Sequence, residues 1–133
     1  MSDLAKRLLA CPRFRWMPGM RANDQRIVAC DPNSSDVCIA DEGCTEEGHT
    51  ARWVEPQRLR PDLSDPATLG CLLALVREAH KQPNAYARLR RNPRSFEGLY
   101  WEVLANAEEW RESALGHGST EAAALVAALE AAL

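Results

Sequence analysis

The sequence predicts an α+β fold, in which a small antiparallel sheet (meander plus hairpin) packs with a central helix over about residues 66–81 and a C-terminal helix over about residues 119–132. Three observations predict it: a strong helix start, three short β-branched segments between turn residues, and a final segment rich in Ala and Leu. The chain has 133 residues, the usual size of one domain. We therefore expect residues 1–133 to form a single α+β domain.

The first part of the chain predicts a short helix followed by a meander. Ser2-Asp3 is a good cap for a helix with Leu4 and Leu8 on one face, which ends at Cys11-Pro12. Three segments with Val, Ile or Trp, each bounded by Asn, Asp, Pro, Ser or Gly, predict antiparallel strands. They are Gln25–Cys30, Asp36–Ala40 and His49–Val54.

The central helix has the clearest local signal. Asp65 at the N-cap and Pro66 at the first helical position are a strong start. Apolar residues then recur at helical spacing, and Pro83 prevents the helix from continuing. A helix from about Pro66 to Lys81 is expected.

Residues 85–115 fit two interpretations. Phe96, Tyr100 and Trp110 have helical spacing, whereas Leu99, Trp101 and Val103 alternate as in a strand that returns over residues 110–115. Periodicity alone leaves the helix and the hairpin open. Beyond this segment we expect a loop at 116–119 and then a final helix capped by Ser119 or Thr120, with Leu125, Val126 and Leu129 facing inward.

Charge is distributed in blocks that a net charge of −3 conceals. The blocks carry +4 over residues 1–30, −6 over 31–51, +2 over 52–60, −2 over 61–76, +5 over 77–94 and −6 over 95–133. Such blocks either attract one another within the fold or leave a polarised surface that steers a charged partner.

The acidic blocks predict a surface for a basic partner protein, because charge complementarity favours such a pairing. The expected contact residues are Asp41, Glu42, Glu46, Glu47, Glu108 and Glu109. The chain also has four tryptophans, Trp16, Trp53, Trp101 and Trp110. We expect most of them in the core and one or two at an interface, where Trp is enriched.

The basic block offers an alternative function, binding to nucleic acid. Its residues are Lys81, Arg88, Arg90, Arg91 and Arg94, with Tyr86 among them. The opposing interpretation is a solvated strand whose arginines pair with glutamates of the next block, such as Glu97 and Glu102. The sequence pI of about 5.6 is far from the value above about 9 that is typical of dedicated nucleic-acid-binding domains.

The five cysteines predict free thiols. No secretory signal precedes them, so a reducing cytoplasm is expected. Cys30, Cys38, Cys44 and His49 form a weak alternative metal site with C-x7-C-x5-C-x4-H spacing, which lacks the tight knuckle of structural zinc sites. We expect no metal, and no membrane segment, because Leu69–Val76 is the longest strongly apolar run.

Catalytic motifs are absent from the sequence. Neither a phosphate-binding loop, a dinucleotide fingerprint, a zinc-protease motif nor a nucleophile elbow occurs. A nucleophilic pair of Cys44 with His49 is the one enzyme alternative. We therefore expect no enzyme activity, no catalytic residue and no cofactor.

Three segments carry a resemblance, in order: LLACPRFRWMPGM at residues 8–20, LSDPATLGCLLALVREA at 63–79 and EAAALVAALE at 121–130. Together they resemble small proteins encoded by tailed phages and prophages of bacteria. The resemblance implies a strand pair over 98–115 before the last helix. It also implies the bacterial cytoplasm and an accessory protein that binds a host or phage protein, such as an anti-CRISPR-like inhibitor of host defence. The acidic insert at 31–50 has no counterpart in it.

Overall fold

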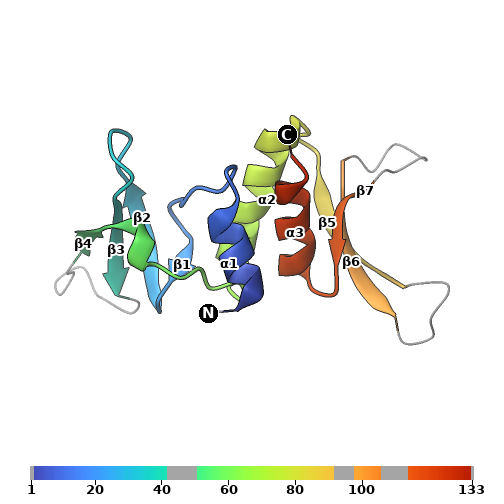
Figure 1. Cartoon of the computed structure of the whole chain (residues 1–133), viewed down its shortest axis with the longest axis horizontal. Helices are drawn as coiled ribbons and strands as arrows, with labels where there is room; N and C mark the ends of the chain where they lie inside the picture. Colours follow the sequence, from blue (N-terminus) through green and yellow to red (C-terminus); the bar gives the residue numbers. More distant parts are fainter. Residues whose placement is uncertain (1, 42–50, 92–97, 106–113, 133) are drawn as a thin grey trace. The chain divides into compact units, whose positions relative to one another are not determined.

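The computed structural model describes residues 2–41, 51–91, 98–105 and 114–132, and it confirms the α+β fold (Figure 1). Three α-helices and two antiparallel sheets make up the described part of the chain. In chain order the elements are α1 (Asp3–Ala10), β1 (Arg21–Ala22), β2 (Gln25–Cys30), β3 (Val37–Asp41), β4 (Ala51–Val54), the 3-10 turn η2 (Pro56–Arg58), α2 (Pro66–His80), β5 (Tyr86–Arg91), β6 (Leu99–Leu104), β7 (Ala114–Gly118) and α3 (Glu121–Glu130).

The chain divides into two compact units, each with its own sheet. The first unit is Arg15–Cys71, and the second joins Ser2–Phe14 to the chain from Leu72 onward. Helix α2 begins in the first unit and ends in the second. The sequence predicts one small sheet, but the strands form two. The reason is that the long α2 segment separates the meander from the hairpin along the chain.

The sheet of the first unit is the expected meander with one further strand. Its order is β1-β2-β3-β4, and all neighbours are antiparallel. The sequence pattern does not predict β1, which joins β2 through a two-residue turn at Asn23 and Asp24. Both residues have positive φ, 51° and 64°, as a tight hairpin turn of type I′ requires.

Strand β3 lies at the centre of the first unit's core. Val37, Cys38, Ile39 and Ala40 are all less than 10% exposed, so the strand is buried on both faces. Met20, Ile27 and Leu59 complete this core. The neighbouring strand β4 is largely exposed and forms the outer edge of the sheet.

Helix α2 begins and ends where its sequence signals place it. The Asp65 carboxylate accepts a hydrogen bond of 2.9 Å from the backbone N–H of Thr68, which satisfies one of the free N–H groups of the first turn. Lys81 has φ 56°, and the N–H of Gln82 bonds to the Arg77 carbonyl at 2.9 Å. This left-handed residue with its closing bond ends the helix before Pro83.

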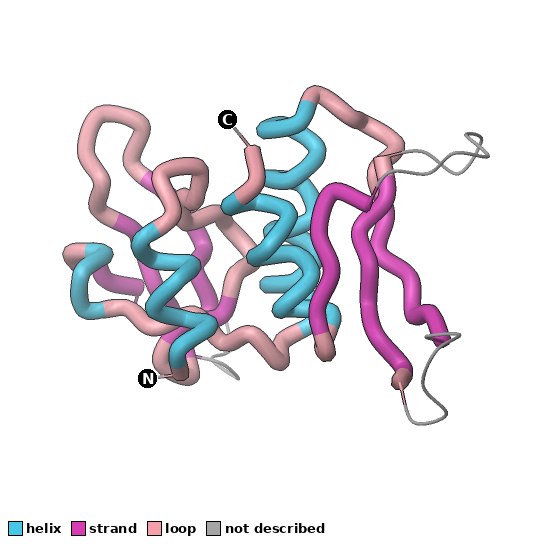
Figure 2. The backbone as a smooth tube through the Cα atoms, turned by 45° about the vertical axis from the view of Figure 1, so that its right-hand side comes forward, coloured by secondary structure: helices cyan, strands magenta, loops and turns pink. Residues whose placement is uncertain are grey.

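The second unit contains a hairpin of β6 with β7, as one interpretation of residues 85–115 predicts, and a further strand, β5. The return strand is Ala114–Gly118 rather than 110–115, of which 110–113 lie outside the described residues. Figure 2 shows these three antiparallel strands side by side. The helical alternative is wrong for residues 99–104. Trp101 and Val103 lie on one face of the sheet, while Tyr100 and Glu102 lie on the other. Pairing with β5 and β7 on both sides explains why the strand pattern prevails.

The loop expected at 116–119 is wrong for most of its length, because Gly116, His117 and Gly118 belong to β7. Helix α3 packs directly against this strand. A Cβ atom on Gly116 would lie 2.7 Å from the carbonyl oxygen of Ala124, and one on Gly118 would lie 2.6 Å from the Cβ of Ala123. The two glycines therefore serve a close approach of helix to strand rather than a turn.

The remaining helices agree with the sequence. Thr120 caps α3 by accepting from the N–H of Ala123 at 3.0 Å, and Leu125, Val126 and Leu129 are buried. Ser2 caps α1, and Arg7 of α1 forms an ion pair with Glu130 of α3. None of the helices in the described ranges has the length and apolar character needed to cross a membrane.

Candidate functional site

Trp53 is the most exposed tryptophan in the described part of the chain. It lies on the edge strand β4 and is 55% exposed. Its neighbours Ala51 and Arg52 are also exposed, whereas Val54 is half-buried. Trp16 and Trp101 are half-buried, and Trp110 lies outside the described residues. An exposed Trp on a free strand edge is typical of an interface anchor, because burying its ring contributes much of the energy of association.

The predicted acidic contact residues are mostly outside the described ranges. These residues are Glu42, Glu46, Glu47, Glu108 and Glu109. Asp41 is described as the last residue of β3, where its backbone pairs with Gln25 of β2. Their role as a contact surface stays a prediction. Along the sequence, Glu46 and Glu47 precede β4 by only a few residues.

The predicted basic set is divided between the two faces of the second sheet. Arg88 and Arg90 lie on the face that carries Glu102, because Arg88 is opposite Glu102 in the register. Arg91 is opposite Leu99 and lies on the other face. Lys81 is at the end of α2, and Arg94 lies outside the described residues. The described members therefore do not form one continuous basic stripe.

Glu102 neutralises part of that basic charge. Its carboxylate is buried, and it accepts hydrogen bonds from Arg88 Nε at 2.8 Å and from Arg90 Nη1 at 3.0 Å. Burial raises the pKa of Glu102, but the two guanidinium groups outweigh it and hold this pKa below its ordinary value. Pairing with glutamates is the predicted alternative to nucleic-acid binding, and the structure confirms this pairing for Arg88 and Arg90.

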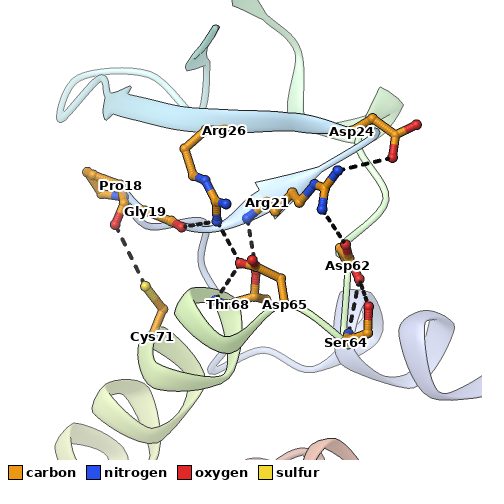
Figure 3. Close-up of polar contacts among 10 residues, drawn as sticks. All are labelled: Pro18, Gly19, Arg21, Asp24, Arg26, Asp62, Ser64, Asp65, Thr68 and Cys71. Carbon is orange, nitrogen blue, oxygen red and sulfur yellow. Dashed lines mark hydrogen bonds and ion pairs between the residues drawn. The ribbon is translucent and has the colours of Figure 1, made fainter. Parts of the chain in front are cut away.

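A second polar cluster joins the meander to the start of α2 within the first unit (Figure 3). Asp65 Oδ2 accepts from Arg26 Nη1 at 2.6 Å and from the Thr68 hydroxyl at 2.9 Å. The Thr68 hydroxyl in turn accepts from the backbone N–H of Arg21 at 2.9 Å. Burial raises the pKa of Asp65, and the bonds from Arg26 and Thr68 lower it to below its ordinary value. Because the Asp65 carboxylate and the Thr68 hydroxyl both bond to the meander, the cluster holds the start of α2 against the strands of the first unit.

The two described cysteines of the metal alternative, Cys30 and Cys38, do not lie on one face of the sheet. Cys30 is opposite Val37, and Cys38 is opposite Ala29, so the two thiols belong to adjacent rungs and point to opposite faces of the sheet. Cys44 and His49, the other members of the metal alternative and the pair of the enzyme alternative, lie outside the described residues. Among the described residues, no three His, Cys, Asp or Glu side chains are placed to hold a metal ion.

Two thiols in the first unit bond to backbone carbonyls of one loop. Cys30 Sγ lies 3.3 Å from the Trp16 oxygen. Cys71 Sγ lies 3.7 Å from the Pro18 oxygen, as Figure 3 shows. Burial raises the pKa of both thiols, and the negative charge of Asp65 adds to the effect at Cys71. Protonated thiols are weak nucleophiles and weak metal ligands, so these two act as packing residues.

An open hollow of about 500 Å³ lies at the end of the sheet in the second unit. It is lined by Leu99, Tyr100, His117, Gly118 and Ser119.

Comparison of the chain with protein-family models, with curated proteins and with solved structures finds no match. The case for a function therefore depends on the described residues and on the sequence patterns.

The sequence analysis misses one surface, an exposed apolar patch in the second unit. Leu89 of β5 is 51% exposed, and Leu99 of β6 is 58% exposed. They share a face with the half-buried Trp101, because Leu89 is opposite Trp101 and Leu99 is two residues before it. The alternation of Arg and apolar residues over Tyr86–Arg91 is the signal that predicts a strand here.

Proposed function

We propose that this protein is a non-catalytic accessory protein of a phage or prophage, which binds a host or phage protein and thereby inhibits a host defence system, as an anti-CRISPR protein does. The observation that carries the binding part is Trp53, 55% exposed on the outer strand β4. Covering the exposed half of a Trp side chain removes roughly 100 Å² of mostly apolar surface, which contributes about 2–3 kcal/mol to binding.

The chemistry of the partner follows from the residues that precede Trp53 in the sequence. The segment before β4 carries Asp41, Glu42, Glu46 and Glu47 without any Lys or Arg. A partner with an apolar pocket beside a basic surface complements this combination. Host proteins that bind nucleic acid have such basic surfaces. The phage setting and the target in host defence rest on the resemblance of residues 8–20, 63–79 and 121–130.

The binding proposal is tested with tagged protein in lysate from lysogenic bacteria. Wild-type protein should retain one partner that is identified by mass spectrometry, and Trp53→Ala should weaken retention at least about tenfold, as loss of about 2 kcal/mol predicts. Val28→Ala is the matched control, since Val28 is an apolar residue of the same unit that is 44% exposed. Equal retention of the partner by wild-type protein and Trp53→Ala would contradict the proposal.

The acidic residues are tested separately by changing Asp41, Glu42, Glu46 and Glu47 to Lys. Binding should fall, and the remaining binding should lose its dependence on salt. A parallel change of Glu108 and Glu109 shows whether the second predicted acidic group takes part. Unchanged binding in both variants would remove the electrostatic part of the proposal and leave the part that depends on Trp53.

The proposed role against host defence needs its own assay. Cells that carry an active CRISPR system and express the protein should allow a targeted phage to form plaques, and cells expressing Trp53→Ala should restrict the phage again. Plaque numbers that do not change with the wild-type protein would contradict inhibition of that system, whereas binding to a partner would stand.

A further inference from the structure

We call one group of residues the β5 edge: Leu89, Arg90 and Arg91 of β5, together with Leu99 of β6. The β5 edge combines an outer strand, exposed apolar side chains and positive charge. Strand β5 is the outer strand of the second sheet, so one side of its backbone has no neighbouring strand among the described residues. Leu89, Arg90 and Arg91 are all exposed. An outer strand with exposed apolar side chains is a template for pairing with another strand.

The apolar side chains of the β5 edge form one patch. Leu89 and Leu99 are 51% and 58% exposed and lie on the face against which α3 packs, as the register with Trp101 and Gly118 shows. Helix α3 contacts chiefly β7, at the opposite side of the sheet, and leaves this end of the face open. A large apolar side chain from a strand beside β5 would lie over Leu89, with Leu99 next to it.

The charges of the β5 edge select the partner. Arg88 and Arg90 both donate to the single carboxylate of Glu102. Arg91 forms no ion pair with any described residue and is exposed. A second copy of this strand would bring six arginines to one shared edge, and like charges across a strand pair are destabilising. An acidic strand is attracted to these arginines, whereas a second copy of β5 is repelled by them.

We propose that the β5 edge binds an extended acidic segment of a partner protein, which adds to the second sheet as a further strand. The residues opposite Arg91, Arg90, Leu89 and Arg88 give the segment its pattern: acidic, acidic, apolar, acidic. Backbone hydrogen bonds along β5 supply affinity, and the side-chain pattern supplies specificity. This surface is separate from Trp53 and does not depend on the role proposed for it.

The test uses the full-length chain labelled with ¹⁵N and a synthetic peptide, acetyl-Thr-Glu-Glu-Leu-Glu-Val-Thr-amide. Peptide binding should shift the amide resonances of Tyr86–Arg91 and slow the hydrogen exchange of those β5 amides that point away from β6. A peptide in which Lys replaces every Glu should leave the spectrum unchanged. Shifts confined to other residues, or none at a millimolar concentration of the acidic peptide, would overturn the proposal.

Substitutions at exposed residues test which side chains of the β5 edge contact the bound peptide. Leu89→Ala should weaken peptide binding about fivefold or more, and Arg91→Glu about tenfold, since each removes a contact that the bound strand needs. Leu99→Ala is a second test of the apolar patch, and Val28→Ala in the first unit should bind as the wild type does. All four positions are exposed, and circular dichroism verifies folding. Equal affinity of the wild type, Leu89→Ala and Arg91→Glu would refute the assignment.

Discussion

Replacing Glu102 by Gln isolates the charge of the most buried carboxylate among the described residues of the second unit. The side chain of Glu102 is only 6% exposed and accepts hydrogen bonds from Arg88 at 2.8 Å and Arg90 at 3.0 Å. Gln has the same shape and keeps one acceptor oxygen, so the packing is preserved while the negative charge is lost. Any change in stability then reports the electrostatic part of this cluster.

The magnitude follows from the two bonds and from the exposure of the arginines. Both bonds keep a charged donor in Glu102→Gln and lose only the charged acceptor, which costs about 1 kcal/mol for each bond, or roughly 2 kcal/mol in all. Arg88 and Arg90 are 34% and 52% exposed, so water replaces part of this loss. We expect a net destabilisation of about 1–2 kcal/mol, which lowers Tm by roughly 3–8 °C in a chain of this size.

The assay is thermal unfolding followed by circular dichroism, at neutral pH and in acid. The pKa of Glu102 is lowered in the folded protein, so its charge stabilises the fold at pH values above the ordinary Glu pKa of about 4.3. This contribution disappears as the pH falls through the lower pKa of the folded state. The difference in Tm between wild type and Glu102→Gln should therefore shrink as the pH is lowered below about 4.

Two results would refute this reasoning about Glu102. One is equal Tm for wild type and Glu102→Gln at pH 7, and the other is a difference that stays constant on acidification. Glu55→Gln is the control, because Glu55 is exposed and its side chain makes no capping hydrogen bond at the start of η2. Its Tm should match that of the wild type at every pH.

Two further pairs of variants test the fold, each by urea unfolding. Asp65→Ala removes the N-cap of α2 and the partner of Arg26 and should cost about 2–3 kcal/mol. Asp24→Asn removes the charge of a long, exposed ion pair and keeps a residue type that tolerates the positive φ of this turn, so it should cost less than about 0.5 kcal/mol. Gly116→Ala forces a Cβ into the backbone of α3 and should cost more than about 2 kcal/mol, whereas Gly70→Ala, with open space inside α2, should stabilise by about 0.5–1 kcal/mol. Equal effects within either pair would contradict the contacts described above.

Helix α2 could be predicted because its limits are set by local chemistry. The Asp65 carboxylate caps the helix by accepting from the N–H of Thr68, three residues later in the sequence. Pro83 prevents the helix from continuing, independently of the tertiary structure. Strand β7 could not be predicted in the same way. Gly116 and Gly118 are typical turn residues, and their place in a strand depends on a helix that begins after them and packs back on them.

The candidate surfaces depend on the order of the strands, which the sequence pattern does not reveal. Trp53 and Trp101 both lie in strands with similar patterns, yet Trp53 is exposed because β4 is an outer strand, and Trp101 is half-buried in the central strand β6. The pairing of Arg88 with Glu102 was one of two interpretations of the charge blocks. The register of β5 against β6 brings about the pairing for these two residues.

The contact between α3 and β7 restricts which sequences can adopt this ending. No layer of side chains separates helix and strand at Gly116 and Gly118, so even a methyl group at either position displaces backbone or the side chain of Ala123. Small residues are required on both partners, on the strand at 116 and 118 and on the helix at 123, 124 and 128. Gly-x-Gly, a capping Thr two residues later and alanines at those helix positions thus form a spacing signature with which distant homologues can be searched for, even where the loops and charge blocks have diverged.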